Sequence, residues 1–268
     1  MDQNPEFETQ ELPAPPAPEL GPKPSKVASE NPIWNGWDVF LLAIIQFVIP
    51  FVVIIPIVVL VAAKTLYPTL TFMQVAQQKL WIALCTQFAW YVVVLIYMVM
   101  FIEGTYRRRF WDAIQWKWPH KTWQFLVPLG MVLVLLQGME KFFRMPKHIP
   151  MQEYLKTPSI AILTAIFAVS LGPLMEELFF RGFLYPVLAR RWGMFAAISI
   201  TSIAFGLIHS AQLAFSPGLV LIVFLVGLVL TIVRAKTGSV GSSLVVHISY
   251  NSTLVILGAI ASRHGLTP

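Results

Sequence analysis

Uninterrupted apolar runs constrain this sequence more than any other feature. Residues 192–233 form a 42-residue stretch in which only His209 can carry a charge. One membrane-crossing helix needs about 20 apolar residues, so this stretch is long enough for two. The whole chain is 57% hydrophobic and 12% charged, whereas a soluble domain is nearer half apolar and a quarter charged. The sequence therefore predicts a polytopic membrane protein, and it excludes a soluble enzyme, a disordered protein and a nucleic-acid-binding protein.

The apolar runs predict an all-α helical bundle of about seven transmembrane helices. Pro50 and Pro56 are expected to kink the first of them. The triplet Ser216-Pro217-Gly218 is expected to form the turn between the fifth and the sixth. The third is short, with a possible extension to Phe143. The predicted spans are 39–63, 80–102, 123–138, 159–188, 194–213, 219–233 and 238–262.

Three regions are predicted along the chain. Residues 1–33 hold eight of the 20 prolines and six acidic residues, and such a segment is expected to be a disordered tail because it cannot bury enough apolar surface. Residues 34–157 hold the first three transmembrane helices and their loops. Residues 158–268 hold the last four, and the polar residues within the spans discussed below lie in this region.

The distribution of basic residues predicts the orientation of the chain in the cell membrane. The tail and the even-numbered loops carry eleven Lys and Arg residues, Arg234 among them, and the opposite side carries seven. Basic residues collect in cytoplasmic loops, so the N-terminus is expected to be cytoplasmic. The net charge of +6 is interpreted in the same way, and no nucleic-acid partner is expected.

Charged residues inside the fourth predicted span require an explanation. Each ionised group costs about 2.5–3.5 kcal/mol at the centre of a bilayer, and Glu176, Glu177 and Arg181 lie within six positions. Glu177 and Arg181 are spaced i, i+4 and can neutralise each other. A purely structural ion pair would account for these two, but it would leave Glu176 unexplained. Gly172-Pro173 is expected to loosen the helix just before the cluster.

Two further helices carry polar groups at a comparable depth. The fifth span contains Phe205 and His209, and the seventh contains His247 and Asn251, both pairs at i, i+4. At 1.5 Å per residue, Glu176, the two histidines and Asn251 lie roughly 15–24 Å from the basic side, so they can share one layer. A carboxylate and an imidazole can activate water, while a second imidazole and a carboxamide can stabilise an oxyanion. The same three ionisable groups, Glu176, His209 and His247, could instead hold a divalent metal such as zinc.

These three motifs resemble those of the CPBP family, which comprises the CAAX prenyl endopeptidases and the bacteriocin-processing (Abi) proteins. They are Glu176-Glu177-x-x-x-Arg181, Phe205-x-x-x-His209 and His247-x-x-x-Asn251, in this order on successive apolar helices. The resemblance implies that Glu176 and His209 activate water and that His247 and Asn251 form an oxyanion hole. It also implies that Glu177 and Arg181 hold their helix in place and that Phe205 packs. It leaves open whether the enzyme is a metalloprotease or a metal-independent glutamate protease.

The sequence thus predicts an intramembrane endopeptidase that hydrolyses a peptide bond of a membrane-associated protein or peptide substrate. Two alternatives remain open at this point. One is a non-enzymatic membrane scaffold or binding protein that retains the motif for structure. The other is a transporter with Glu176 as a proton relay, although transporters often show paired repeats and here the polar residues lie in the C-terminal part.

Overall fold

The computed structural model describes residues 30–143 and 146–264, and these contain helices and no strands. Six helical runs are long and apolar enough to cross a membrane: Gly36–Thr65, Leu80–Tyr106, Trp123–Phe142, Pro158–Ile208, Pro217–Thr237 and Val240–Arg263. The predicted all-α membrane bundle is confirmed. Its elements are α1 (Gly36–Ala43), η1 (Ile44–Val48), η2 (Pro50–Ile54), α2 (Ile55–Thr65), α3 (Phe72–Gln78), α4 (Leu80–Tyr106), α5 (Phe110–Ala113), α6 (Trp123–Leu133), η3 (Val134–Phe142), α7 (Pro150–Glu153), α8 (Pro158–Ala168), α9 (Leu171–Glu177), η4 (Leu178–Leu184), α10 (Tyr185–Ile208), α11 (Pro217–Thr237) and α12 (Val240–Arg263).

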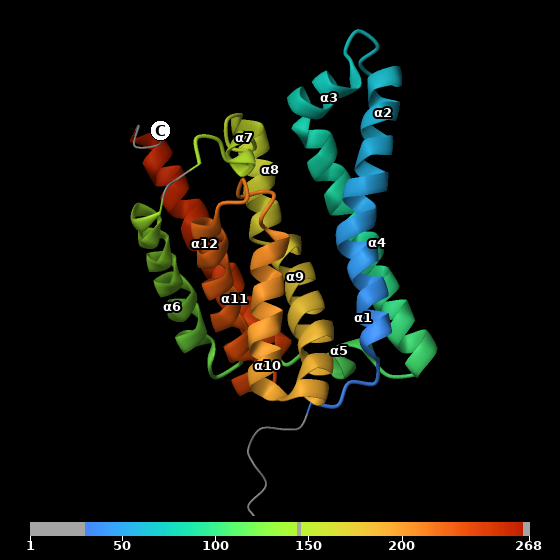
Figure 1. Cartoon of the computed structure of the whole chain (residues 1–268), viewed down its shortest axis with the longest axis vertical. Helices are drawn as coiled ribbons and strands as arrows, with labels where there is room; N and C mark the ends of the chain where they lie inside the picture. Colours follow the sequence, from blue (N-terminus) through green and yellow to red (C-terminus); the bar gives the residue numbers. More distant parts are fainter. Residues whose placement is uncertain (1–29, 144–145, 265–268) are drawn as a thin grey trace, which may run out of the picture.

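The fourth run reverses its direction at Gly193. It contains 51 residues, far more than one crossing needs, and Gly193 has φ 80° and ψ 168°, which a side chain would strain. Figure 1 shows the two arms, α9 and the later part of α10, side by side. When the two arms of this run are counted separately, the six candidate runs become seven segments, which is the number predicted from the sequence.

The fifth predicted segment is shorter than expected. We predicted a helix to residue 213, but α10 ends at Ile208, and the next residues form turns in which Ala214 and Phe215 have positive φ. The physical reason is the reversal into α11, which begins at Pro217; the residue before a proline is disfavoured in a helix. His209 therefore caps the end of α10.

The first run accommodates its prolines by widening the helix. Residues 44–48 and 50–54 are π-helical on either side of Ile49, and Pro50 begins the second of these stretches. A proline lacks the N–H that the regular ladder needs, and π-helical turns are a usual way to absorb such a defect. The run starts at a capping box, in which Asn35 accepts from the backbone N–H of Asp38 and the Asp38 carboxylate accepts from that of Asn35.

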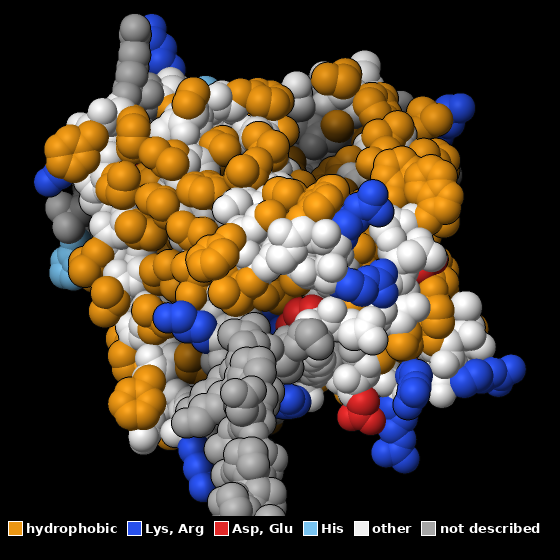
Figure 2. Space-filling model, turned by 60° about the horizontal axis from the view of Figure 1, so that its bottom comes forward, with side chains coloured by type: hydrophobic (Ala, Val, Ile, Leu, Met, Phe, Trp, Pro, Cys, Tyr) orange, Lys and Arg blue, Asp and Glu red, His pale blue; other side chains and the backbone are white. Residues whose placement is uncertain are grey.

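The surface matches a bilayer on its sides and water at its ends. Many large hydrophobic side chains are exposed, for example Trp37, Phe51, Phe125 and Phe195. Figure 2 shows hydrophobic side chains over most of the visible flank, and Lys and Arg side chains gathered toward the end that lies at the bottom of Figure 1. An apolar flank of this extent on a helical bundle is the surface that lipid covers.

The segment before α1 is held against the bundle. The predicted tail falls mostly outside the described residues, but Glu30 forms an ion pair with Arg234 at 2.7 Å. The Trp34 indole N–H donates to the carbonyl of Phe183, and Arg190 donates to the carbonyl of Trp34. We interpreted Arg234 as a loop charge, which is wrong: its side chain is fully buried, because Glu30 neutralises it.

Cysteine labelling tests this arrangement. In a Cys85→Ala background, we expect Thr69→Cys and Arg263→Cys to react with a membrane-impermeant maleimide from one side, and Arg108→Cys and Lys121→Cys from the other, because these exposed positions lie at opposite ends of the bundle. Reaction of residues 69 and 121 from the same side would show that α4, the candidate span between them, does not cross.

Candidate active site

A break between α8 and α9 sets the position of the acidic pair. Helix α8 ends at Ala168, and Ser170 has non-helical dihedral angles of φ −131° and ψ −103°. Pro173 contributes to this break, since it has no N–H to donate and its ring clashes with the carbonyl four residues earlier. The expected loosening before the cluster is thus present. After Glu177 the chain continues as the π-helix η4.

Glu177 joins two of the predicted motifs through one carboxylate oxygen. Its Oε1 accepts a hydrogen bond from Arg181 at 2.9 Å and lies 2.9 Å from Nδ1 of His247. Both Glu177 and Arg181 are fully buried. The predicted ion pair is therefore formed, and the same carboxylate also fixes the ring of a histidine 70 residues away.

Arg181 connects α9 and η4 to α11. Besides Glu177 it donates to the carbonyl of Gly227 at 2.9 Å and to the hydroxyl of Thr231 at 3.3 Å. Its guanidinium lies 4.5 Å from the ring centroid of Phe205. Gly227 is required for this packing, because a Cβ at that position would lie 2.8 Å from the Phe205 ring. Phe205 is buried against this guanidinium.

The two histidines approach Glu176 from different helices. Nε2 of His209 lies 3.8 Å from Oε1 of Glu176, and Nε2 of His247 lies 3.7 Å from Oε2. Nδ1 of His209 is 2.7 Å from the carbonyl of Phe205, which can only accept, so that nitrogen carries the proton. Nδ1 of His247 faces the Glu177 carboxylate and is protonated for the same reason. Each ring thus turns its second nitrogen toward Glu176, whose side chain is 18% exposed.

Asn251 is placed differently from the other predicted residues. Its amide donates to the carbonyl of Ala168 at 2.7 Å, at the end of α8. It lies one turn beyond His247 on α12, and one of its two N–H groups remains available. The structure therefore brings Glu176, Glu177, Arg181, His209 and His247 into one cluster, with Asn251 at its border.

Two residues of the N-terminal helices belong to the surroundings of this cluster and were not predicted. Gln46 in η1 is fully buried and donates to the carbonyl of Met175 at 3.1 Å. Tyr91 in α4 stacks on Phe167 with ring centroids 5.5 Å apart. The available signal was a glutamine inside an apolar run, since a polar side chain in hydrocarbon needs a partner.

The types of donor group around Glu176 suit a divalent metal, but their arrangement does not. Each histidine offers Nε2 while its other nitrogen binds a carbonyl or a carboxylate, as metal-binding histidines usually do. The Glu177 carboxylate contacts Arg181 and Nδ1 of His247 together. Within the described residues, however, no group of three or more His, Cys, Asp or Glu side chains is arranged to hold a metal ion.

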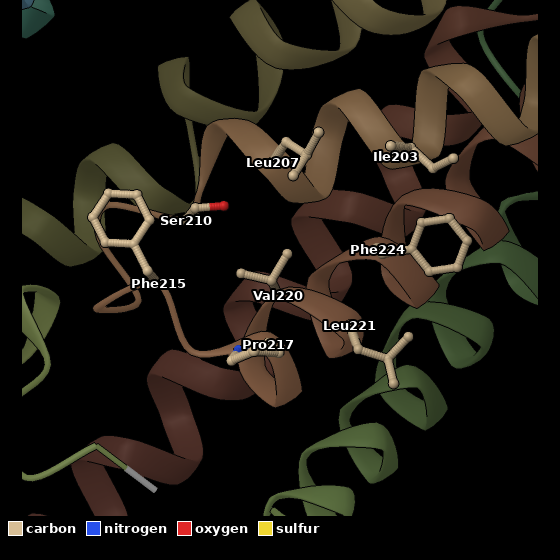
Figure 3. Close-up of a pocket in the computed structure, with 8 residues that line it drawn as sticks. All are labelled: Ile203, Leu207, Ser210, Phe215, Pro217, Val220, Leu221 and Phe224. Atoms are coloured by element: carbon tan, nitrogen blue, oxygen red, sulfur yellow. The ribbon is translucent and has the colours of Figure 1, made fainter.

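A shallow, open apolar groove of about 430 Å³ lies on the surface next to the histidine motif of α10. Figure 3 shows that its lining side chains come from α10, α11 and the turn between them. One of them belongs to Ser210, the residue that follows His209 in the sequence. Such a surface suits a hydrocarbon chain. The lining residues are Ile203, Leu207, Ser210, Phe215, Pro217, Val220, Leu221 and Phe224.

The fold and the site define a polytopic membrane protein with a buried glutamate–histidine cluster. Residues 158–253 match the family model of the type II CAAX prenyl endopeptidase Rce1-like proteins. This match confirms the resemblance to the CPBP family, and it indicates a protease that is embedded in a membrane. No curated protein and no solved structure matches the chain.

The ion pair predicts a difference between single and double variants. Arg181→Ala would leave the Glu177 carboxylate buried without its cation, so we expect a loss of about 3–5 kcal/mol in stability and a lower yield of folded protein. The double variant Glu177→Gln with Arg181→Gln should recover part of that yield, because no buried charge remains. Thermal unfolding in detergent measures the stability of both variants.

Arg191→Ala is the matched control for this series, since Arg191 is exposed, and we expect it to leave the unfolding temperature unchanged. An Arg181→Ala protein as stable as this control would show that the pair contributes nothing to the fold.

Proposed function

We propose that this protein is an intramembrane endopeptidase in which Glu176 and His209 activate a water molecule. One observation carries the proposal: the Glu176 carboxylate lies between two imidazole nitrogens, and the other nitrogen of each ring is engaged elsewhere. The Glu176 carboxylate and Nε2 of His209 both accept protons, so together they form a position for a molecule that donates two, such as water.

His209 is suited to the role of base. The Phe205 carbonyl fixes the tautomer that leaves Nε2 free, and a base must lie within reach of the proton that it removes. In the proposed first step, water loses a proton to Glu176 or His209, and its oxygen attacks the carbonyl carbon of the scissile peptide bond. The captured proton then goes to the leaving amine, so the pair is restored when the bond breaks.

His247 and Asn251 are the proposed donors to the oxyanion. His247 can donate from Nε2 when its ring is an imidazolium, and the Glu177 carboxylate at Nδ1 supports that charge. Asn251 retains one N–H after its bond to Ala168. Donors that are fixed before the reaction stabilise the developing charge without reorganisation, and one such donor accounts for about 10²–10³ in rate.

The substrate class follows from the surroundings of the site. A peptidase within apolar helices acts on a membrane-associated protein or peptide, and the open apolar groove lined by Leu207 and Ser210 suits a lipid chain. The description of the matched family model points to a prenylated C-terminal Cys-aliphatic-aliphatic-X peptide. We propose that the protein acts in the cell membrane with the basic end of the bundle and the N-terminus in the cytoplasm.

Replacement of Glu176 is the direct test of catalysis. Glu176→Gln keeps size and hydrogen bonding but removes basicity, so we expect cleavage of a farnesylated Cys-aliphatic-aliphatic-X peptide to fall about 10²-fold or more, with normal folding. Glu153→Gln is the control, since Glu153 lies on α7 and pairs with Lys156. The inactive variant should also retain uncleaved native substrates, which mass spectrometry can identify. Equal turnover by the Glu176→Gln and Glu153→Gln proteins would contradict the assignment and favour a scaffold.

Metal dependence has its own test. A bound zinc ion would supply a water molecule with a pKa near 7, and Glu176, His209 and His247 would be its ligands. We propose direct activation instead, so we expect full activity after exhaustive chelation and no stoichiometric metal by elemental analysis. Activity that disappears on chelation and returns with one equivalent of zinc would overturn this preference.

A further inference from the structure

Helix α4 carries a buried polar side chain that the proposed mechanism does not use. Its buried residues are Ile82, Gln87, Tyr91, Val94, Met98 and Ile102. Gln87 is 7% exposed, and neither its Oε1 nor its Nε2 has a hydrogen-bond partner. In the described part of the chain, no other side chain has two buried polar atoms without a partner. A carboxamide is seldom buried in this way, because it loses its bonds to water and gains none.

Contacts of its neighbour Tyr91 place this residue on the side of the site where Phe167 and Asn251 lie. Tyr91, one turn along α4, stacks on Phe167, and Asn251 binds the neighbouring carbonyl of Ala168. The Tyr91 phenol lies beside the Gln87 amide without an aligned hydrogen bond. Tyr91 also belongs to the same cluster of buried side chains as Met175, the residue before Glu176. Figure 1 shows α9 between α4 on one side and α10 to α12 on the other, and α4 and α12 both contact α9.

The free groups of Gln87 match a peptide bond. A carboxamide presents one acceptor and one donor side by side, as a peptide group does. A peptide held extended for cleavage exposes its own N–H and C=O, and within a membrane these need partners from the protein. A carboxylate ligand would instead call for an arginine, and the buried face of α4 contains no cation.

We propose that Gln87 is a substrate-binding residue that hydrogen-bonds the main chain of the bound peptide on the side of the site where Phe167 and Asn251 lie. The proposal rests on the peptidase function argued above. It adds a subsite from a helix outside residues 158–253, the region that matches the family model.

The test compares Gln87→Met with wild type, with a farnesylated Cys-aliphatic-aliphatic-X peptide in detergent micelles as the probe. Methionine has a similar length and no amide. We expect KM to rise roughly three- to tenfold for each lost hydrogen bond, with kcat changed less. We also expect the substrate-free protein to unfold at the same or a higher temperature, because the amide has no partner to lose.

Two further variants provide the controls. Gln78→Met makes the same change at an exposed position on α3 and should alter neither KM nor stability. Gln46→Met removes the bond to Met175 and should lower the unfolding temperature, which shows how a structural glutamine behaves.

The outcomes distinguish a failure of the proposed Gln87 subsite from a failure of the proposed peptidase function. Cleavage by wild type that is lost in Glu176→Gln supports the peptidase independently of Gln87. Given that result, an unchanged KM in Gln87→Met overturns the subsite. A raised KM with an unfolding temperature lowered as in Gln46→Met also overturns it, because the amide would then act through the fold. If wild type and Glu176→Gln are equally inactive on the probe, the proposed function fails for this substrate class, and the subsite fails with it.

Discussion

The Glu177 carboxylate is the contact on which the rest of the site depends. One of its oxygens binds Arg181 and lies at hydrogen-bonding distance from His247, so charge neutralisation and histidine orientation are the same interaction. Removal of Arg181 would leave the buried Glu177 carboxylate without its cation, which is costly in a low-dielectric interior. Because the Glu177 contact uses Nδ1 of His247, Nε2 is left to face Glu176. The Glu177–Arg181 pair thus holds the glutamates of α9 and His247 of α12 together in one site.

The backbone carbonyls in and around η4 also need hydrogen-bond partners, because this region lies among apolar helices. The π-helix η4 departs from the regular ladder, and unsatisfied carbonyls are expensive within a membrane. Side chains from other segments bind them: Gln46 binds Met175, Arg234 binds Arg181, and Trp34 binds Phe183. The helix that carries the glutamates is therefore fixed by α11 and by the N-terminal part of the chain, which explains why Arg234 is buried with Glu30.

Much of this could be predicted from the sequence. The apolar runs located the membrane helices because span length is set by the bilayer, and the i, i+4 spacings located the Glu177–Arg181 pair because they need only a helix. The end of α10 at Ile208 was missed because the turn before Pro217 contains residues as apolar as a helix. Arg234 and Gln87 were missed for another reason: whether a polar residue near or within a span is buried depends on contacts between distant helices, and spacing along one helix contains no such information.

The protonation of the two site histidines tests the account most directly. The five histidines can be labelled with ¹⁵N in the folded protein in nanodiscs, and the signals of His209 and His247 assigned by single His→Gln variants. The account predicts that Nδ1 carries a proton in both rings at neutral pH, because each faces an oxygen that can only accept. An unprotonated Nδ1 in His247 would contradict it, since Glu177 would then not hold the ring and Nε2 would not be positioned by the buried pair.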